Sequence, residues 1–308
     1  MAFVEMEELV EAVVKQVLQS LRLQDPGELV DAQKKGSMPL VAANWKMNFP
    51  AHFQNEKSDL SKALDDFSNC LSLAPLKQAQ TVVMPPSSLL YPLNEAFRKH
   101  GLDVQLGAQD MHPAPSGPHT GELSGSLLRV AGAEWVIVGH SERRAAGESD
   151  EVVAEKLGSV LEQGFGAILC VGETLKERRD GSTFRILRLQ LSAALSRVVS
   201  WRLDPGLFAV AYEPVWAIGT GEKATTEQIS EAAVFCRQTV AQTFDYNVAK
   251  RVRILYGGSV KPGNTAQIMR VTDVDGVLVG GASLDGDSFA EITSEVVRES
   301  LRKTEAKS

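Results

Sequence analysis

Beyond residue 38, the order of apolar and polar positions divides the chain into short apolar runs and longer segments of helical period. Most of the short runs are continuously apolar, as expected for strands of a parallel sheet that is covered on both faces. The longer segments repeat apolar residues every three or four positions, which indicates amphipathic helices. The predicted strands are 40–45, 80–84, 104–108, 135–139, 167–171, 207–212, 252–256 and 276–279. The predicted helices include 58–73, 150–163, 184–200, 226–244 and 265–271.

This alternation predicts an α/β fold. Repeated strand–helix units over about 250 residues have the size of one closed (β/α)₈ barrel, which we expect to span 38–308. The alternative is an open doubly wound sheet, which typically carries a glycine-rich fingerprint after its first strand. Here the first strand leads into Asn44-Trp45-Lys46-Met47-Asn48, which is no such fingerprint. The barrel is therefore the favoured architecture.

Residues 1–37 do not follow the alternation. We predict an amphipathic helix over 1–24 and a linker over 25–37. The apolar stripe of this helix consists of Met6, Leu9, Val10, Val13, Val14, Val17, Leu18 and Leu21. Gly36 and Ser37 stand directly before Met38, so two origins stay open: an engineered fusion with Met38 as the original start, or a natural linker.

Composition narrows the class of protein. The net charge of −7 and the pI near 5.4 argue against a nucleic-acid or anionic-membrane partner, but not against an anionic substrate. Three scattered cysteines, Cys70, Cys170 and Cys236, are typical of a reducing compartment, so we expect a cytoplasmic protein. No stretch reaches the roughly 20 apolar residues of a membrane helix, and the acidic N-terminus does not fit a secretory or transit signal.

Polar residues follow several of the predicted strands. Asn44 and Lys46 follow the first strand, His140 the fourth and Glu213 the sixth. Because the carboxyl ends of barrel strands form the active-site face, we expect these side chains to lie close together. Two glycine-rich segments, 256–260 and 280–283, follow the last two strands, where backbone N–H groups can bind a phosphate. Each feature alone has an ordinary structural explanation, but together, in this order, they favour an active site.

The segment after Glu213 carries a further signal. Pro214 follows the carboxylate at once, and the loop closes on small residues up to Gly221. This is the arrangement of a general base at a barrel mouth beneath a lid, which keeps water from a reactive intermediate.

These motifs resemble the triosephosphate isomerase family. The matching segments are Ala43-Asn44-Trp45-Lys46-Met47-Asn48, Gly107-Ala108-Gln109, Thr120-Gly121-Glu122, Val138-Gly139-His140-Ser141-Glu142-Arg143-Arg144, Cys170-Val171-Gly172-Glu173-Thr174, 211–221, Tyr256-Gly257-Gly258-Ser259-Val260 and Val279-Gly280-Gly281-Ala282-Ser283-Leu284. The resemblance implies a TIM barrel that interconverts D-glyceraldehyde 3-phosphate and dihydroxyacetone phosphate, without cofactor or metal.

The resemblance also implies roles. Glu213 would be the base, and His140, kept neutral by the helix that it opens, would polarise the carbonyl. Lys46 would balance the charge of the enediolate, and 214–220 would be the lid. The residues that bind substrate would be Asn44, Lys46, Gly219, Ser259, Gly280 and Gly281. Cys170 has no implied role beyond packing, and the role of Glu142 near Lys46 stays open.

The long loop 109–123 carries Thr120, Gly121 and Glu122. In the family this loop inserts into a second subunit, so the resemblance implies a homodimer; the alternative is an ordinary surface loop. Asp110 stands where asparagine is usual in the family, and His119 where an aromatic residue is common. In addition, 145–148 is one residue shorter than the family pattern and lacks an aromatic residue before its glycine, which leaves the place of Glu148 open.

The N-terminal helix resembles the encapsulation peptides of bacterial microcompartments, which implies a shell protein as partner of residues 4–23 and a location inside the compartment. The alternatives are packing against the chain's own barrel and self-association. For the barrel, two alternatives to this isomerase stay open: a non-catalytic scaffold, and an isomerase of another small phosphorylated sugar.

Overall fold

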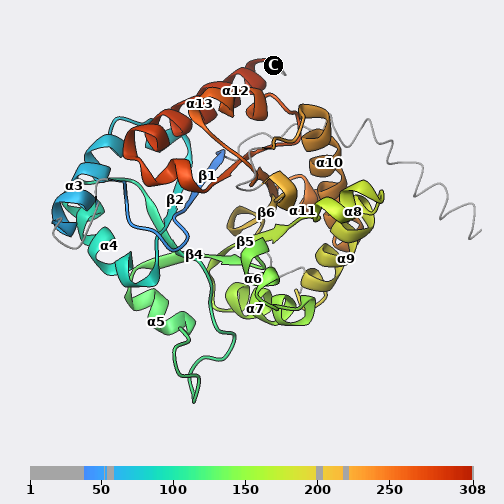
Figure 1. The fold of residues 1–308 in the computed structure, drawn as a ribbon, viewed down its shortest axis with the longest axis horizontal. Helices are drawn as coiled ribbons and strands as arrows, with labels where there is room; N and C mark the ends of the chain where they lie inside the picture. Colours follow the sequence, from blue (N-terminus) through green and yellow to red (C-terminus); the bar gives the residue numbers. More distant parts are fainter. Residues whose placement is uncertain (1–37, 52, 54–58, 199–203, 218–221, 307–308) are drawn as a thin grey trace, which may run out of the picture. The chain divides into compact units, whose positions relative to one another are not determined.

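The computed structural model describes residues 38–51, 53, 59–198, 204–217 and 222–306. Within them, eight parallel strands close into a barrel in the order β1 to β8, and the helices form an outer ring (Figure 1). The (β/α)₈ prediction is therefore confirmed. The predicted helix 1–24 and linker 25–37 lie outside the described residues. None of the described helices is both long and apolar enough to cross a membrane.

The strands lie where the hydrophobic pattern predicts them. They are β1 (Leu40–Asn44), β2 (Gln80–Met84), β3 (Gln105–Ala108), β4 (Ala133–Val138), β5 (Gly166–Val171), β6 (Phe208–Tyr212), β7 (Arg253–Tyr256) and β8 (Gly276–Val279). Every boundary agrees with the prediction within about two residues, the ordinary margin for element ends. The barrel closes because Leu40 of β1 pairs with Gln80 of β2 on one side and with Gly276 of β8 on the other.

The helices follow the strands and cover the barrel. The α-helices are α3 (Leu60–Leu71), α4 (Leu90–Lys99), α5 (Gly125–Val130), α6 (Ser141–Ala145), α7 (Asp150–Glu162), α8 (Leu175–Arg179), α9 (Thr183–Leu195), α10 (Thr226–Thr243), α11 (Tyr246–Ala249), α12 (Pro262–Met269) and α13 (Gly286–Glu305). Short 3₁₀ turns are η1 (Leu76–Gln78), η2 (Ser87–Leu89), η4 (Pro205–Leu207), η5 (Val215–Ala217) and η6 (Gly281–Leu284). The five predicted helices correspond to α3, α7, α9, α10 and α12.

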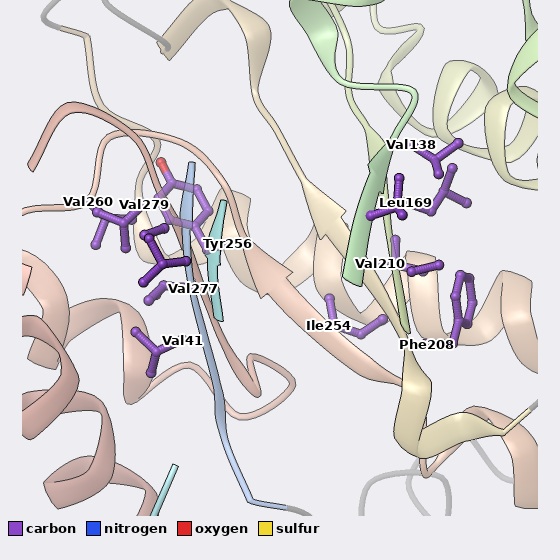
Figure 2. Packing of buried hydrophobic residues seen from close by; sticks show 14 of the residues in the cluster. Val41, Val138, Leu169, Phe208, Val210, Ile254, Tyr256, Val260, Val277 and Val279 are labelled. Carbon is purple, nitrogen blue, oxygen red and sulfur yellow. The ribbon is translucent and has the colours of Figure 1, made fainter. Parts of the chain in front are cut away.

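Side chains along each strand alternate between two hydrophobic layers. The layer inside the barrel contains Leu40, Ala42, Val82, Met84, Trp135, Ile137, Ile168, Cys170, Ala209, Ala211, Leu255 and Leu278. The other layer packs between strands and helices; Figure 2 shows part of it, including the register partners Val210 and Ile254. Because strands alternate with a period of two, the position after Ala42 and Ala211 in the inner series falls on Asn44 and Glu213. The alternation alone therefore directs both polar side chains to the barrel mouth.

Candidate active site

A cavity of about 480 Å³ lies at the carboxyl ends of the strands. Its wall includes Asn44 and Lys46 from the end of β1, His140 from the end of β4 and Glu213 from the end of β6. The remaining predicted members that line it are Ser259, Gly280 and Gly281. The structure thus brings together all predicted catalytic and substrate-binding residues except Gly219, which lies outside the described residues.

His140 and Glu213 face each other across the floor of this cavity. The Nε2 atom of His140 lies 3.1 Å from Oε1 of Glu213, and both side chains are almost fully buried. The backbone N–H of Ser141 donates to Oε2 of Glu213 at 3.1 Å, and that of Glu142 donates to Nδ1 of His140 at 3.2 Å. Since Nδ1 accepts a hydrogen bond, this network assigns the ring proton to Nε2, which donates to the carboxylate.

The pair shifts the pKa values of both groups. Burial acts to lower the pKa of His140, but the charge of Glu213 and the hydrogen bond to it outweigh burial, so the pKa is raised. Burial acts to raise the pKa of Glu213, while His140 and the Ser141 N–H lower it, and the net pKa is lowered. A helix N-terminus alone would lower the pKa of His140. The pKa is raised instead, because the nearby carboxylate of Glu213 has the larger effect.

Lys46 reaches the same cavity from the end of β1. Its Nζ lies 2.6 Å from Oε1 of Glu142, the carboxylate two residues after His140. Among the described non-glycine residues, Lys46 alone has φ in the left-handed region, at 53°. Such a backbone conformation costs of order 1–3 kcal/mol and persists only where neighbours hold it.

Two amide side chains hold this strained backbone. Oδ1 of Asn44 accepts the N–H of Lys46 at 3.0 Å, and Nε2 of Gln109 donates to the carbonyl of Lys46 at 2.8 Å. Gln109 donates also to the carbonyl of Met84 at 2.9 Å, so it links the ends of β1 and β2. Sequence reasoning included Gln109 in a motif but gave it no role.

The glycine-rich ends of β7 and β8 also line the cavity. A Cβ atom on Gly280 would lie 3.6 Å from Cε of Lys46, and one on Gly281 would meet no atom within 4 Å. The backbone is therefore accessible here, beside an ammonium group. Nδ2 of Asn264 fixes the adjoining loop by donating to the carbonyl of Ser259 at 2.9 Å.

The predicted lid 214–220 is described over its first four residues. Nε1 of Trp216 donates to Oε1 of Glu173 at 2.9 Å, and the N–H of Val215 donates to the carbonyl of Glu173 at 3.1 Å. Oε1 of Glu173 also accepts the hydroxyl of Tyr212 at 3.2 Å. A buried carboxylate at the end of β5 therefore anchors the start of the lid, a role for Glu173 that sequence reasoning missed.

Cys170 lies inside the barrel below Glu213. It is fully buried, and burial, followed by the nearby charge of Glu213, raises the pKa of its thiol well above the usual value. A thiol in this state is a packing group rather than a nucleophile, in line with the prediction.

A buried ionic cluster lies behind α6. Nζ of Lys156 contacts Asp110 at 2.6 Å and Glu148 at 2.5 Å, and Arg143 lies 3.1 Å from Asp110. Glu148, whose place the sequence left open, is thus buried and paired. Asp110 is the second carboxylate that contacts Lys156. Its contact with Arg143 links the base of the long loop to α6.

The long loop between β3 and α5 extends away from the barrel (Figure 1). In this loop the ring centroids of His112 and His119 lie 4.0 Å apart with their planes inclined by 32°, and Nδ1 of His112 accepts the N–H of Ala114 at 3.1 Å. Thr120, Gly121 and Glu122 lie exposed in the loop, away from the cavity. Within the described parts of the chain, no three His, Cys, Asp or Glu side chains are grouped to hold a metal ion.

The convergence of a carboxylate, an imidazole and an ammonium group on one cavity at the carboxyl end of a (β/α)₈ barrel defines a barrel enzyme. Residues 39–296 match the triosephosphate isomerase family. The chain therefore belongs to the triosephosphate isomerase family, a family of isomerases.

Curated proteins that are similar in sequence to this chain belong to the same family. Triosephosphate isomerases of Alkalilimnicola ehrlichii, Ruegeria pomeroyi and Endomicrobium trichonymphae are 44%, 43% and 41% identical to the chain over 262, 256 and 255 residues. The matched parts cover 83%, 83% and 82% of this chain and 97%, 96% and 97% of those proteins.

Proposed function

We propose that this chain is a triosephosphate isomerase, which interconverts D-glyceraldehyde 3-phosphate and dihydroxyacetone phosphate through an enediolate. The observation that carries the proposal is the meeting of His140, Glu213 and Lys46 on one cavity beside glycine-rich loops. Burying a carboxylate against an imidazole costs free energy, and a non-catalytic scaffold would gain no function from the pair of Glu213 and His140.

In the proposed reaction, Glu213 removes the proton from the carbon beside the carbonyl and returns it to the neighbouring carbon. His140 donates its Nε2 proton to the carbonyl oxygen as the C–H bond breaks, and it then accepts the proton of the other oxygen. The Nδ1 atom keeps its bond from the N–H of Glu142 throughout, so the ring works as the neutral imidazole. No proton is gained or lost overall.

Lys46 balances negative charge in this scheme. When the carbonyl oxygen becomes an enediolate oxygen, the ammonium group can leave Glu142 for the substrate, and the backbone held by Asn44 and Gln109 keeps it at the cavity wall. The phosphate is proposed to bind the N–H groups of Gly280 and Gly281, the hydroxyl of Ser259 and, from the lid, Gly219.

The lid 214–220 is proposed to close over the bound substrate and to exclude water, which would otherwise promote loss of phosphate from the enediolate. A closing movement of its first residues relative to β5 would have to break or remake the bonds that Trp216 and Val215 donate to Glu173.

The test is a coupled assay on the purified full chain, beside Glu213→Gln. The substitution keeps the size of the side chain and removes the base, so kcat is expected to fall by about 10³-fold. Glu95→Gln, on the exposed face of α4, is the matched control and should leave kcat unchanged. Absence of turnover by the folded wild type would contradict the proposal, and a panel of other small phosphorylated sugars would then separate a different isomerase from a scaffold.

We also propose that the chain forms a homodimer through the long loop and the surface beside it. Met47 is 94% exposed at the end of β1, and Leu127 and Val130 of α5 are 55% and 83% exposed, so an interface that covered them would remove apolar surface from water. Met47→Glu should shift sedimentation toward the monomer. Leu301→Glu, at an exposed apolar position of α13, is the control; equal effects of the two would contradict the proposed interface.

For residues 1–24 we propose a role as a targeting segment that binds a microcompartment shell protein, so that the enzyme works inside that compartment within the cytoplasm. The support is the apolar stripe in the sequence and the start of the family match at residue 39. A fluorescent protein carrying residues 1–24 should accumulate in co-expressed shells, and serine at Leu9, Val13 and Val17 should abolish this. Diffuse fluorescence of both fusions would contradict the proposal.

A further inference from the structure

The backbone of Gly172, directly after β5, lies beyond the last residue pair that β4 and β5 form. Val171 and Glu173 accept N–H groups from Glu213 and Val215 on the β6 side, at 2.8 and 3.1 Å. Successive residues of a parallel strand direct their polar groups to opposite neighbours, so those of Gly172 face the β4 side. The register between β4 and β5 ends at the pair Val138 and Leu169, three residues before Gly172.

The side chain of Gln190 takes the place of the missing strand. Gln190 lies on α9, which packs against β5. Its Oε1 accepts the N–H of Gly172 at 2.8 Å, and its Nε2 donates to the carbonyl of the same residue at 3.1 Å. Both polar groups of the Gly172 backbone are therefore satisfied by one amide, in the two-point geometry that a neighbouring strand would supply.

Gly172 in turn lies directly against the backbone of Glu213. A Cβ atom at Gly172 would lie 1.7 Å from the carbonyl oxygen of Glu213 and 2.7 Å from its carbonyl carbon. The position of the Gly172 peptide thus limits where Glu213 can lie. Gln190, Gly172, Glu213 and Val215 also line one cavity of about 240 Å³.

We propose that Gln190 is a positioning residue for the isomerase reaction: by fixing Gly172, it holds the backbone of the base Glu213 and of the first lid residues in register. It does not touch the substrate. This inference rests on the proposed function for its kinetic part.

The test compares Gln190→Met, which keeps the length of the side chain and removes both bonds, with Gln163→Met. Gln163 is a half-buried glutamine at the end of α7, at the other end of the barrel. Because a small misplacement of a base slows proton transfer, Q190M should lower kcat roughly tenfold and change KM less than twofold. The primary isotope effect with substrate deuterated at the reacting carbon should rise, and Q163M should change none of these.

A second readout does not depend on turnover. If Glu213 shifts in Q190M, its contact with His140 loosens, and the pKa of His140, followed by NMR, should fall relative to the wild type. Gln190→Glu keeps the acceptor for the Gly172 N–H and loses the donor, so its effects should lie between those of wild type and Q190M. It is also the variant to use if Q190M does not fold.

The outcomes separate the two proposals. A wild type without isomerase turnover would contradict the proposed function, while the titration of His140 would still decide the role of Gln190. Equal kinetic losses in Q190M and Q163M, an effect on KM alone, or an unchanged His140 pKa in Q190M would each overturn the positioning role. Loss of folding in both Gln190 variants would overturn it too, because the amide would then be required by the fold itself.

Discussion

Nε2 of His140 lies 3.1 Å from Oε1 of Glu213, and this contact couples the titration of the two groups. The carboxylate of Glu213 outweighs the effect of burial and raises the pKa of His140. The imidazole and the Ser141 N–H outweigh the effect of burial and lower the pKa of Glu213. A substrate that enters between them would remove this mutual support. Each group would then move toward the value that burial favours, a more basic carboxylate and a less basic imidazole, which suits the proposed proton transfers.

The coupling predicts that Glu213→Gln lowers the pKa of His140. The substitution removes the charge that raises this pKa and leaves burial, which lowers it, in place. Detection of the imidazole nitrogens by NMR across a pH titration measures the shift. Glu142→Gln is the matched control, since Glu142 is the smallest of the named influences on His140, and it should lower the pKa less. An unchanged or raised pKa in E213Q would show that Glu213 does not govern His140.

Gly172→Ala is predicted to remove isomerase activity. The new Cβ would meet the carbonyl oxygen of Glu213 at 1.7 Å, so the backbone of the base must move. Gly276→Ala is the control, because its Cβ would meet the carbonyl of Leu40 at 1.9 Å, an equally severe clash at the opposite end of the barrel. Both variants should unfold at lower temperature than the wild type, whereas the folded fraction of G276A should keep its kcat. Similar kcat losses in the two would show that the clash acts through the barrel as a whole.

The sequence predicted the barrel because its strands are continuous apolar runs, whose ends are marked by polar or glycine residues. It predicted that Asn44 and Glu213 lie close together, and the alternation of inner and outer positions along β1 and β6 in the structure accounts for their inward direction. Helix ends were less well predicted: α12 begins at Pro262, because proline suits the first helical position, before the apolar pattern itself begins at 265.

The supports of the site could not be predicted in this way. Gln190 meets Gly172, Gln109 meets Lys46 and Glu173 meets Trp216 through side-chain hydrogen bonds between different elements of the fold, and such contacts leave no periodic signal. The raised pKa of His140 is a second example. It depends on a distance between two strand ends, whereas the local helix pattern indicates the opposite direction.

Lys46→Met is predicted to weaken binding of anionic ligands. Lys46 is the ammonium group at the cavity wall beside Gly280, and methionine keeps most of its length without the charge. Loss of one charge-assisted contact, about 1.5–3 kcal/mol, corresponds to roughly a 10–150-fold weaker inhibition by inorganic phosphate. Lys261 also lines the cavity but is exposed to solvent, so Lys261→Met should weaken inhibition much less. Equal effects would indicate that overall positive charge, and not the position of Lys46, determines phosphate binding.

Lys156→Met is predicted to be strongly destabilising. Lys156 is only 4% exposed and lies between Asp110 and Glu148, so its removal leaves two carboxylates close together, with Arg143 at 3.1 and 3.6 Å as their remaining cation. Breaking a buried ion pair in this way costs about 3–5 kcal/mol, which urea unfolding at a fixed protein concentration measures.

Two variants make this prediction specific. Arg197→Met breaks the exposed pair with Glu155 and should cost no more than about 1 kcal/mol. Asp110→Asn in the K156M background removes one of the two carboxylates left without their lysine, so it should recover part of the lost stability. A K156M chain no less stable than R197M, or a double variant less stable than K156M alone, would show that the cluster contributes little. In that case the pairing of Asp110 with Lys156 would not be what stabilises this part of the barrel.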